Sequence, residues 1–283
     1  MDVLERISKY ASGHTKSQRK ISNYILNNFD NTASMTAEKI AEAVGVSSST
    51  VVRYATELGY KGYPELKRAL GEAQRIKLTA VQRINAAASL SSEKEILNYV
   101  LGNDIERLGT TLDEIDGESF KTFVDSIIEA DSVYISGMRT SSFLADILGF
   151  YLNYLRPNVR IIHENEAATV YEQLFHIGEK DLFIGISFPR YSAVARSAME
   201  YAKSKGAKIL AITDCNASPL YEVAELSLFA RSEMASFLDS LVAPLSLINA
   251  LVVAVGSRCP EKTSKAFETL EHVWDKYKVY EKK

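Results

Sequence analysis

The sequence predicts an all-α N-terminal domain with a helix-turn-helix, followed by an α/β domain whose parallel sheet carries helices on both faces. The first part is predicted by residues 3–70, which have helical spacing and no convincing strand, and by the helix-turn-helix pattern of residues 37–56. The second is predicted from residue 132 onward, where apolar, β-branched runs alternate with amphipathic stretches. Such alternation is typical of a parallel sheet buried on both faces.

The composition is typical of a soluble globular protein, since 46% of the 283 residues are hydrophobic and 24% are charged. This length suffices for two domains. The longest apolar run, residues 241–255, contains Pro244 and is too short to span a membrane, and the charged N-terminus does not read as a signal peptide. Cys215 and Cys259 lack the spacing of metal ligands and the density of a disulfide scaffold. We expect a cytoplasmic protein with no membrane partner, no metal and no cofactor.

Charge is divided unevenly along the chain. The net charge of −3 is unusual for a DNA-binding protein, but residues 1–77 carry 12 Lys and Arg against 8 Asp and Glu. The remaining residues carry 21 against 28. The positive excess therefore lies in the helical domain, where it is consistent with attraction to DNA phosphates.

Within the helical domain, residues 37–56 have the features of a helix-turn-helix. Ala41 is small where two helices would cross closely, and Gly45 lies four residues later, where the turn can require φ > 0. A hydroxyl run from Ser47 to Thr50 follows, where such residues cap a helix or contact DNA. The corner is expected to be filled by Ile40, Val44, Val46, Val51 and Tyr54. An ordinary helical hairpin with a glycine turn is the alternative.

The second helix of this motif is the predicted recognition helix. Arg53 is expected to contact a guanine edge with both arms of its guanidinium, with a phosphate contact as the alternative. Tyr60 and Lys61 follow the helix and are expected to hold the DNA backbone. The predicted DNA-binding residues are Ser47, Ser48, Ser49, Thr50, Arg53, Tyr60 and Lys61.

The chain is expected to divide at a polar, alanine-rich segment. Residues 1–77 are assigned to the DNA-binding domain, residues 78–98 to a helical or flexible linker, and residues 99–283 to the second domain. Further helices are expected to begin at Pro64 and to run over about 95–116, and Ile21, Tyr24, Ile25 and Phe29 are spaced for one helical face. The predicted strands are residues 132–136, 159–163, 182–187, 209–213 and 226–229, with helices over 141–155, 192–205 and 237–255.

Two of the predicted strands run into polar loops that precede helices. In each loop, hydroxyls and one arginine lie where backbone N–H groups and the positive end of a helix dipole are directed. Arginine adds a planar fork that suits phosphate or carboxylate. We therefore predict an anion site, although serines at such positions also serve only as helix caps. The predicted ligand-binding residues are Gly137, Arg139, Thr140, Ser141, Ser142, Ser187, Arg190, Tyr191 and Ser192.

The order of the two domains resembles the RpiR/MurR family of bacterial transcriptional regulators. The resemblance covers nearly the whole chain and is strongest in residues 40–70, 181–187 and 202–228. It implies a helix-turn-helix joined to a sugar-isomerase (SIS) domain, a homodimer or homotetramer, binding to double-stranded operator DNA, and control by a phosphosugar or an acidic sugar. Helices over residues 237–255 and 267–277 are the expected subunit interface.

The two ligand loops depart from the family pattern that they resemble. The family's Gly-x-Gly-x-Ser falls on residues 137–141, and its Ser-x-Ser-Gly-x-Thr falls on residues 187–192. Arg139 and Arg190 each replace a glycine, and Pro189 replaces a serine and removes an N–H donor. We hypothesise a guanidinium clamp suited to a more negatively charged ligand. The alternative is a degenerate site, in which the arginines fill the pocket or pair with Glu164, Glu166 or Asp214.

Two other classes of function compete with an effector-controlled regulator. One is a phosphosugar isomerase with an accessory DNA-binding domain, because isomerisation needs a base near the sugar and His163, Glu164 and Glu166 follow a predicted strand. Such residues are more often a satisfied histidine and solvated carboxylates, so we expect no enzyme and assign no catalytic residue. The other is a DNA-binding scaffold without a ligand.

Overall fold

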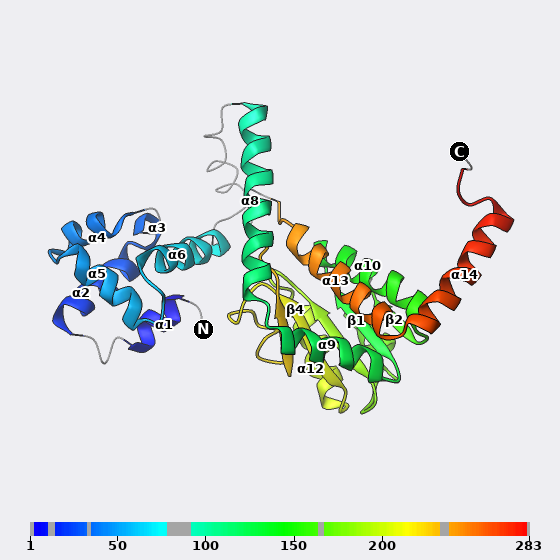
Figure 1. The fold of residues 1–283 in the computed structure, drawn as a ribbon. Coiled ribbons are helices and arrows are strands. Elements are labelled where there is room, and N and C mark those ends of the chain that lie inside the picture. Colours follow the sequence, from blue (N-terminus) through cyan, green and yellow to red (C-terminus); the bar gives the residue numbers. More distant parts are fainter. Residues whose placement is uncertain are drawn as a thin grey trace. The chain divides into compact units, whose positions relative to one another are not determined.

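The computed structural model describes residues 3–10, 15–32, 35–77, 92–163, 167–232 and 238–281 (Figure 1). The chain forms two compact units, and the main division along the chain falls between Ser91 and Ser92. The predicted linker begins with residues 78–91, which lie outside the described residues, and its last residues belong to a helix of the second unit.

The regular elements in the described residues of the first unit are all helices. Its elements are α1 (Val3–Tyr10), α2 (Lys16–Asn27), α3 (Phe29–Thr32), α4 (Ala37–Val44), α5 (Ser48–Glu57) and α6 (Tyr63–Lys77). The predicted start of a helix at Pro64 is confirmed to within one residue. The predicted helical face ending at Phe29 is wrong in one respect, because α2 ends at Asn27 and Phe29 begins α3. Ile21, Ile25 and Phe29 are nevertheless all buried in one core.

The second unit holds a five-stranded parallel sheet in the order β2-β1-β3-β4-β5. The predicted positions of all five strands are confirmed, with ends shifted by at most one residue. The strands are β1 (Val133–Gly137), β2 (Val159–Ile162), β3 (Leu182–Ile186), β4 (Lys208–Thr213) and β5 (Leu226–Phe229). The helices are α8 (Glu93–Glu114), α9 (Gly117–Glu129), α10 (Thr140–Leu155), α11 (Ala167–Gln173), α12 (Ala193–Ser204), α13 (Val242–Arg258) and α14 (Pro260–Tyr277).

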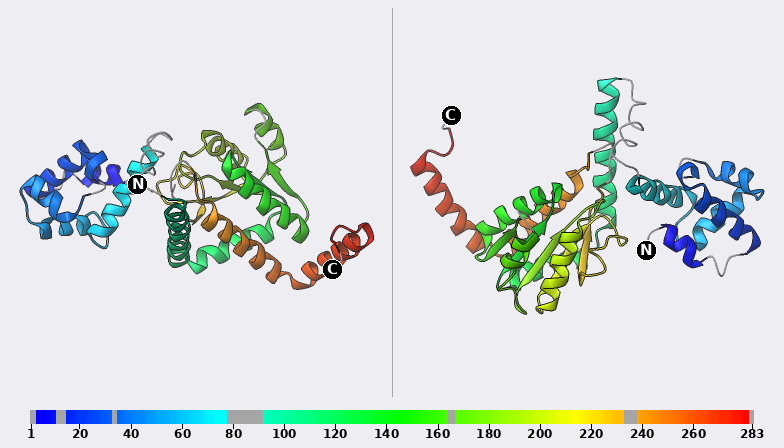
Figure 2. Two further views of the ribbon diagram at one scale, coloured as in Figure 1. Left: turned by 90° about the horizontal axis from the view of Figure 1, so that it is seen from above. Right: turned by 180° about the vertical axis from the view of Figure 1, so that it is seen from behind.

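Helices cover both faces of the sheet, as predicted (Figure 2). Helices α9, α10 and α13 pack on one face, where Ile135, Ile184 and Ile212 point from the central strands. Helices α11 and α12 pack on the other face, against Phe183 and Ile209. Successive side chains of a strand point to opposite faces, so strands buried on both sides must be apolar throughout.

Two predicted helices have different ends in the structure. The predicted helix 95–116 is α8, which ends at Glu114 because Asp116 caps the following helix α9. The predicted helix 237–255 is wrong at its start, since residues 238–241 are not helical and α13 begins at Val242. The polar contacts of Ser240 hold this preceding segment in a non-helical conformation.

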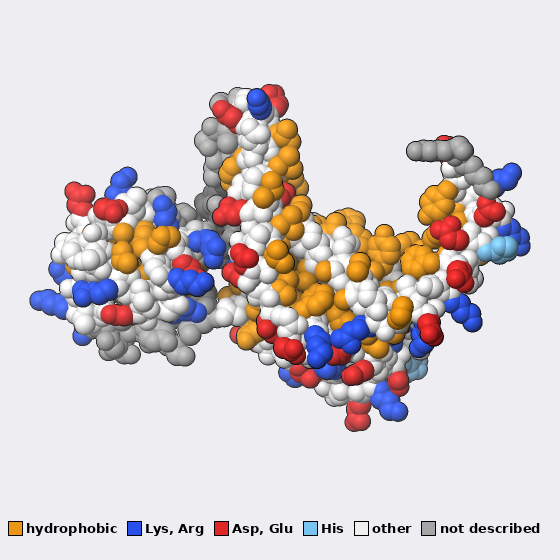
Figure 3. All heavy atoms as spheres, viewed as in Figure 1, with side chains coloured by type: hydrophobic (Ala, Val, Ile, Leu, Met, Phe, Trp, Pro, Cys, Tyr) orange, Lys and Arg blue, Asp and Glu red, His pale blue; other side chains and the backbone are white. Residues whose placement is uncertain are grey.

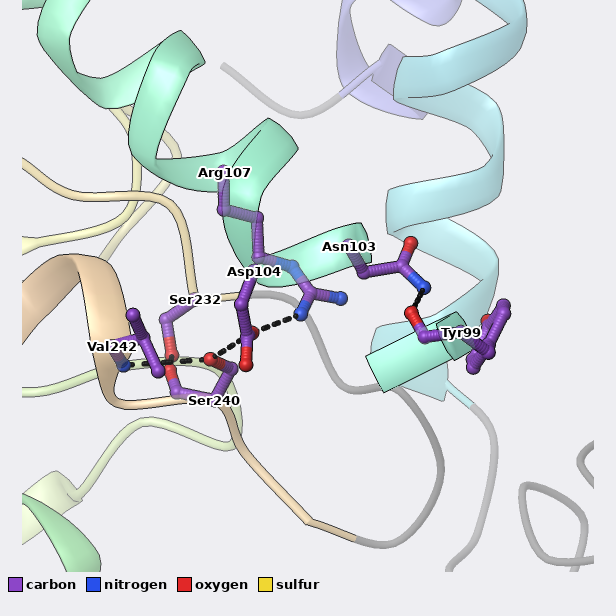
Figure 4. A network of polar contacts seen from close by, with 7 residues as sticks. All are labelled: Tyr99, Asn103, Asp104, Arg107, Ser232, Ser240 and Val242. Carbon is purple, nitrogen blue, oxygen red and sulfur yellow. Dashed lines mark hydrogen bonds and ion pairs between the residues drawn. The ribbon is translucent and has the colours of Figure 1, made fainter. Parts of the chain in front are cut away.

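Ser240 belongs to a buried polar cluster that joins α8 to the segment before α13 (Figure 4). Ser240 Oγ donates to Asp104 Oδ1 at 2.6 Å, and Arg107 Nη1 donates to the same oxygen at 3.0 Å. Asp104 and Arg107 are both buried. Ser232 Oγ donates to the backbone oxygen of Ser240 at 2.8 Å. The cluster therefore fixes the middle of α8 to the sheet domain.

Helices α13 and α14 meet at a sharp bend. Cys259 ends α13 and also precedes Pro260, the first residue of α14, and the two axes differ by 106°. No side chain of α14 is buried. In the described ranges, no single helix is both long and apolar enough to cross a membrane, and these two meet the criteria only when taken together across their bend.

Large apolar side chains are exposed along α8 and over α10, α13 and α14 (Figure 3). Ile105 and Leu112 of α8 are 71% and 78% exposed. Phe150 of α10 and Val253 of α13 are 54% and 66% exposed. Contiguous exposed apolar surface of this kind is typical of a protein interface.

Candidate functional site

The helix-turn-helix corner is built by two caps and a glycine. Thr36 accepts a hydrogen bond from the backbone of Lys39 and begins α4, and Gly45 ends it with φ 72° and ψ 48°. Ser47 Oγ accepts from Thr50 N at 3.3 Å and begins α5. Left-handed backbone costs glycine nothing and costs other residues about 1–2 kcal/mol, so Gly45 sets the angle between the two helices.

The apolar filling of this corner agrees with the sequence. Ile40, Val51 and Tyr54 are buried, and Val44 and Val46 pack partly against them. The Tyr54 hydroxyl lies 2.8 Å from Ser22 Oγ of α2, and burial raises the pKa of Tyr54 to about 12. This contact fastens the predicted recognition helix α5 to α2.

The predicted DNA-binding residues are accessible to different degrees. Ser48 and Arg53 are exposed, and neither side chain bonds to another described residue. Ser49 Oγ and Thr50 Oγ1 each lie 2.8 Å from Ser47 Oγ, so these three hydroxyls form one capping group at the start of α5. Their contact with DNA stays a prediction.

Tyr60 and Lys61 follow α5 and differ in their surroundings. The guanidinium of Arg6 lies over the Tyr60 ring, 5.0 Å from its centre, and donates to the backbone oxygen of Leu58 at 3.1 Å. Tyr60 is therefore half-buried, whereas Lys61 is exposed. The stacked arginine adds a positive charge beside the two residues predicted to hold the DNA backbone.

Substitution at Gly45 tests the corner. An added Cβ meets no atom within 4 Å, so only the positive φ is costly. We expect Gly45→Val to destabilise the N-terminal domain by about 1–2 kcal/mol and to weaken DNA binding, because the β-branched residue resists left-handed backbone. We expect Gly45→Asn to be milder. Chemical denaturation and DNA titration measure both effects, and equal behaviour of the two variants would contradict this explanation.

The first predicted ligand loop connects β1 to α10. Gly137 ends the strand, and the backbone of Ser141 packs so closely that a Cβ on Gly137 would lie 2.2 Å from the Ser141 oxygen. Arg139 precedes α10 with φ 56° and ψ −125°, and its backbone oxygen accepts from Ser142 Oγ at 2.6 Å. Thr140 is exposed. Ser141 is 5% exposed, and its hydroxyl bonds to no described residue.

The second predicted ligand loop connects β3 to α12. Ser187 is buried, and its Oγ accepts a hydrogen bond from Ser192 N at 3.2 Å. This bond joins the first and last residues of the loop. Ser192 Oγ in turn accepts from Ala195 N at 3.2 Å and caps α12. Arg190 lies between them, exposed and with φ 64°.

Strand pairing brings the two loops together. Strands β1 and β3 are neighbours, and Gly137 pairs with Ile186 in their register. Both strands therefore end at the same edge of the sheet, where ligands of parallel α/β sheets bind. This edge holds the two arginines at positive φ and the two buried serines.

A buried carboxylate at the end of β4 was not among the predicted site residues. Tyr191 Oη donates to Asp214 Oδ1 at 2.9 Å, and Thr213 Oγ1 lies 3.2 Å from the same oxygen. Burial raises the pKa of Asp214 above its usual range, and it also raises that of Cys215, to about 12. Asp214 is therefore engaged by hydroxyl donors, and no ion pair joins it to Arg139 or Arg190.

Of the three residues considered for isomerase chemistry, the structure describes only His163, so no catalytic group can be assembled from the described residues. His163 is exposed, with Nδ1 3.8 Å from Asp146 Oδ1, and its backbone bonds to the side chain of Gln173. Glu164 and Glu166 lie outside the described residues. Within the described segments, no cluster of His, Cys, Asp and Glu has the arrangement of a metal site.

Comparison with known families matches both parts of the chain. Residues 1–75 match the helix-turn-helix domain of the rpiR family, and residues 126–254 match the SIS domain. An uncharacterized HTH-type transcriptional regulator of Caldanaerobacter subterraneus is 23% identical over 98% of this chain and 99% of its own length.

Two solved structures show a similar fold. The sugar isomerase domain of the RpiR transcription factor from Sphaerobacter thermophilus is 29% identical, with a TM-score of 0.59, and the match covers 61% of this chain and 96% of that one. The Vibrio vulnificus NanR protein complexed with ManNAc-6P is 22% identical, with a TM-score of 0.56, and the match covers 96% and 98% of the two chains.

Proposed function

Because the chain belongs to the RpiR family, which joins a helix-turn-helix domain to a SIS domain, we propose that it is a transcriptional regulator whose affinity for operator DNA changes when an anionic sugar binds. The observation that carries the proposal is that one chain combines two features. One is the capped helix α5 with the exposed Arg53, and the other is the pair of loops after β1 and β3 at one edge of the sheet. Such a protein would act in the cytoplasm, where its DNA is.

The anionic sugar is proposed to lie between the β1–α10 and β3–α12 loops. Ser141, Ser187 and Ser192 supply hydroxyls there, and the starts of two helices favour negative charge. The similarity of fold to a protein complexed with ManNAc-6P supports a phosphosugar as the class of ligand. We propose that the chain has no isomerase activity, and turnover of phosphosugars by the purified protein would contradict that.

A second copy of the chain is proposed to cover the exposed apolar surface of α8, α10, α13 and α14. Dimerisation would place two recognition helices on one duplex, which is how helix-turn-helix proteins read paired half-sites. An effector shifts DNA affinity only if it binds one arrangement of the two copies better than another. Sedimentation of the full chain measures the association.

Anisotropy titration of labelled promoter fragments from the chain's own genomic neighbourhood tests the proposal as a whole. We expect binding that is stronger than to random DNA and that changes when a sugar phosphate is added. Absence of binding at low salt, with and without candidate sugars, would contradict the proposal.

Arg53 provides the sharpest test of DNA reading. We expect Arg53→Ala to weaken binding to the operator by about 1–3 kcal/mol and to relax preference at one base position, because a guanidinium that contacts guanine is lost. Lys39→Ala, which removes another exposed cation in the same domain, is the control for general charge loss. If Arg53→Ala weakens operator and random DNA equally, Arg53 contacts phosphate instead.

A further inference from the structure

Two arginines occupy equivalent places in the neighbouring loops of the candidate ligand site. Arg139 follows the end of β1 and Arg190 follows the end of β3, and these strand ends are paired in the sheet. Both side chains are exposed, and neither forms a hydrogen bond or an ion pair with another described residue. Two guanidiniums are therefore free to bind a ligand at this edge.

The backbone at both positions is unfavourable for a side chain. Arg139 has φ 56° and Arg190 has φ 64°, a region that glycine enters without cost. Among the other described residues, positive φ occurs at three glycines, Gly45, Gly59 and Gly206, and also at Asn158 and Lys278. Glycine would adopt the backbone of these two positions at lower cost than arginine. Arginine at both positions is explained if the two side chains contact a ligand.

A separate observation at the same site concerns the hydroxyl of Ser141. Ser141 is 5% exposed, and its hydroxyl bonds to no described residue. Its oxygen is not among the fully buried side-chain atoms that lack a partner, so the hydroxyl keeps access to solvent and is open to a ligand oxygen. Phosphate oxygens accept such bonds at the start of a helix.

No ion pair joins the carboxylate of Asp214 to Arg139 or Arg190 in the described residues. The oxygens of Asp214 accept hydrogen bonds from Tyr191, at 2.9 and 3.1 Å. The helix starts and hydroxyls of the two loops already provide for one phosphate, so the arginines add positive charge beyond what that phosphate requires. The planar fork of arginine matches a carboxylate with two parallel hydrogen bonds.

We propose that the natural effector carries two acidic groups: a phosphate held by Ser141, Ser187 and Ser192, and a carboxylate held by Arg139 and Arg190. The ligand class is thus a phosphorylated sugar acid rather than a neutral sugar phosphate. The inference rests on the proposed function, because it defines the ligand of that same site.

Calorimetric titration of the full-length protein with matched pairs of ligands tests the proposal. Each pair consists of an aldose phosphate and the corresponding aldonic acid phosphate, such as glucose 6-phosphate and 6-phosphogluconate, with further pentose and hexose pairs. Gluconate and inorganic phosphate supply each acidic group alone. We expect the acid phosphate of one pair to bind at least about tenfold more tightly than its neutral partner, the usual effect of one charged hydrogen-bonded contact.

Variants of the chain separate recognition of the carboxylate from recognition of the phosphate. Arg139→Gly and Arg190→Gly should fold normally, because glycine relieves the positive φ, and should lower affinity for the acid phosphate by about tenfold. Their affinity for the neutral sugar phosphate should fall by a smaller factor than their affinity for the acid phosphate. Ser141→Ala should weaken both ligands. The control is Arg196→Ala, which removes an exposed arginine of α12 that pairs with Glu200.

The titrations distinguish failure of the two-acid assignment from failure of the proposed effector control. Equal affinity for the members of every pair, or an equal loss of both ligands in the arginine variants, would overturn the two-acid assignment and leave the regulator proposal intact. Failure of every sugar phosphate and every acid phosphate to bind would remove the effector from the proposed function as well, while operator binding would still be measured independently.

Discussion

Replacing Gly137 with alanine is expected to destabilise the SIS domain by about 3 kcal/mol and to abolish binding of the sugar ligand. The added Cβ would lie 2.2 Å from the backbone oxygen of Ser141 and 2.7 Å from its carbonyl carbon. Both are backbone atoms, so no side-chain rotation can relieve the overlap. The first turn of α10 must move, and the buried Ser141 hydroxyl moves with it.

Chemical denaturation of the full chain gives the stability of this variant, and calorimetry gives its ligand affinity. Gly117→Ala is the matched control, because Gly117 begins α9 in the same domain and an added Cβ meets nothing within 4 Å. We expect that control to change stability by less than about 1 kcal/mol. A Gly137→Ala variant that binds ligand as the parent chain does would show that the β1–α10 loop is not the site.

Removing Asp104 is expected to destabilise the same domain by about 3–5 kcal/mol. Asp104 accepts from Arg107 at 3.0 Å and from Ser240 at 2.6 Å, and its loss in Asp104→Ala would leave a buried guanidinium without its counter-charge. The chemical denaturation midpoint measures the effect. The exposed pair of Glu118 and Lys121, 3.9 Å apart, is the control, and Glu118→Ala should cost less than about 1 kcal/mol.

A double variant tests the reason for that loss. Asp104→Ala combined with Arg107→Met removes both charges, so it should recover much of the stability lost in Asp104→Ala alone. If the double variant is less stable than the single one, the penalty comes from lost packing of α8 and not from an unpaired buried charge.

Features set by nearby residues could be predicted from the sequence. The five strands follow from short apolar runs, and the helix-turn-helix follows from Ala41, Gly45 and the hydroxyl run that begins at Ser47, which lie close together in the chain. The family and its two kinds of domain were identified correctly for the same reason, because both are carried by continuous motifs.

Features that depend on residues far apart in the chain could not be predicted. Asp104 and Ser240 are 136 positions apart, and their contact determines where α13 begins. Tyr191 and Asp214 are 23 positions apart, and no local motif predicts that they are joined. The arginines at positions 139 and 190 could be recognised as replacements for glycine, whereas their positive φ became visible only in the structure. Contact of the candidate site with ligand or DNA stays a prediction.

The bend between α13 and α14 makes the C-terminal helix sensitive to chain length. Pro260 fixes where α14 begins, so every later side chain has a set direction around the helix axis. One inserted residue would turn all that follow by about 100° and carry Phe267 and Val273 to another side of the helix. Insertions and deletions between Pro260 and Val273 should therefore be rarer among related chains than substitutions at the polar positions of α14.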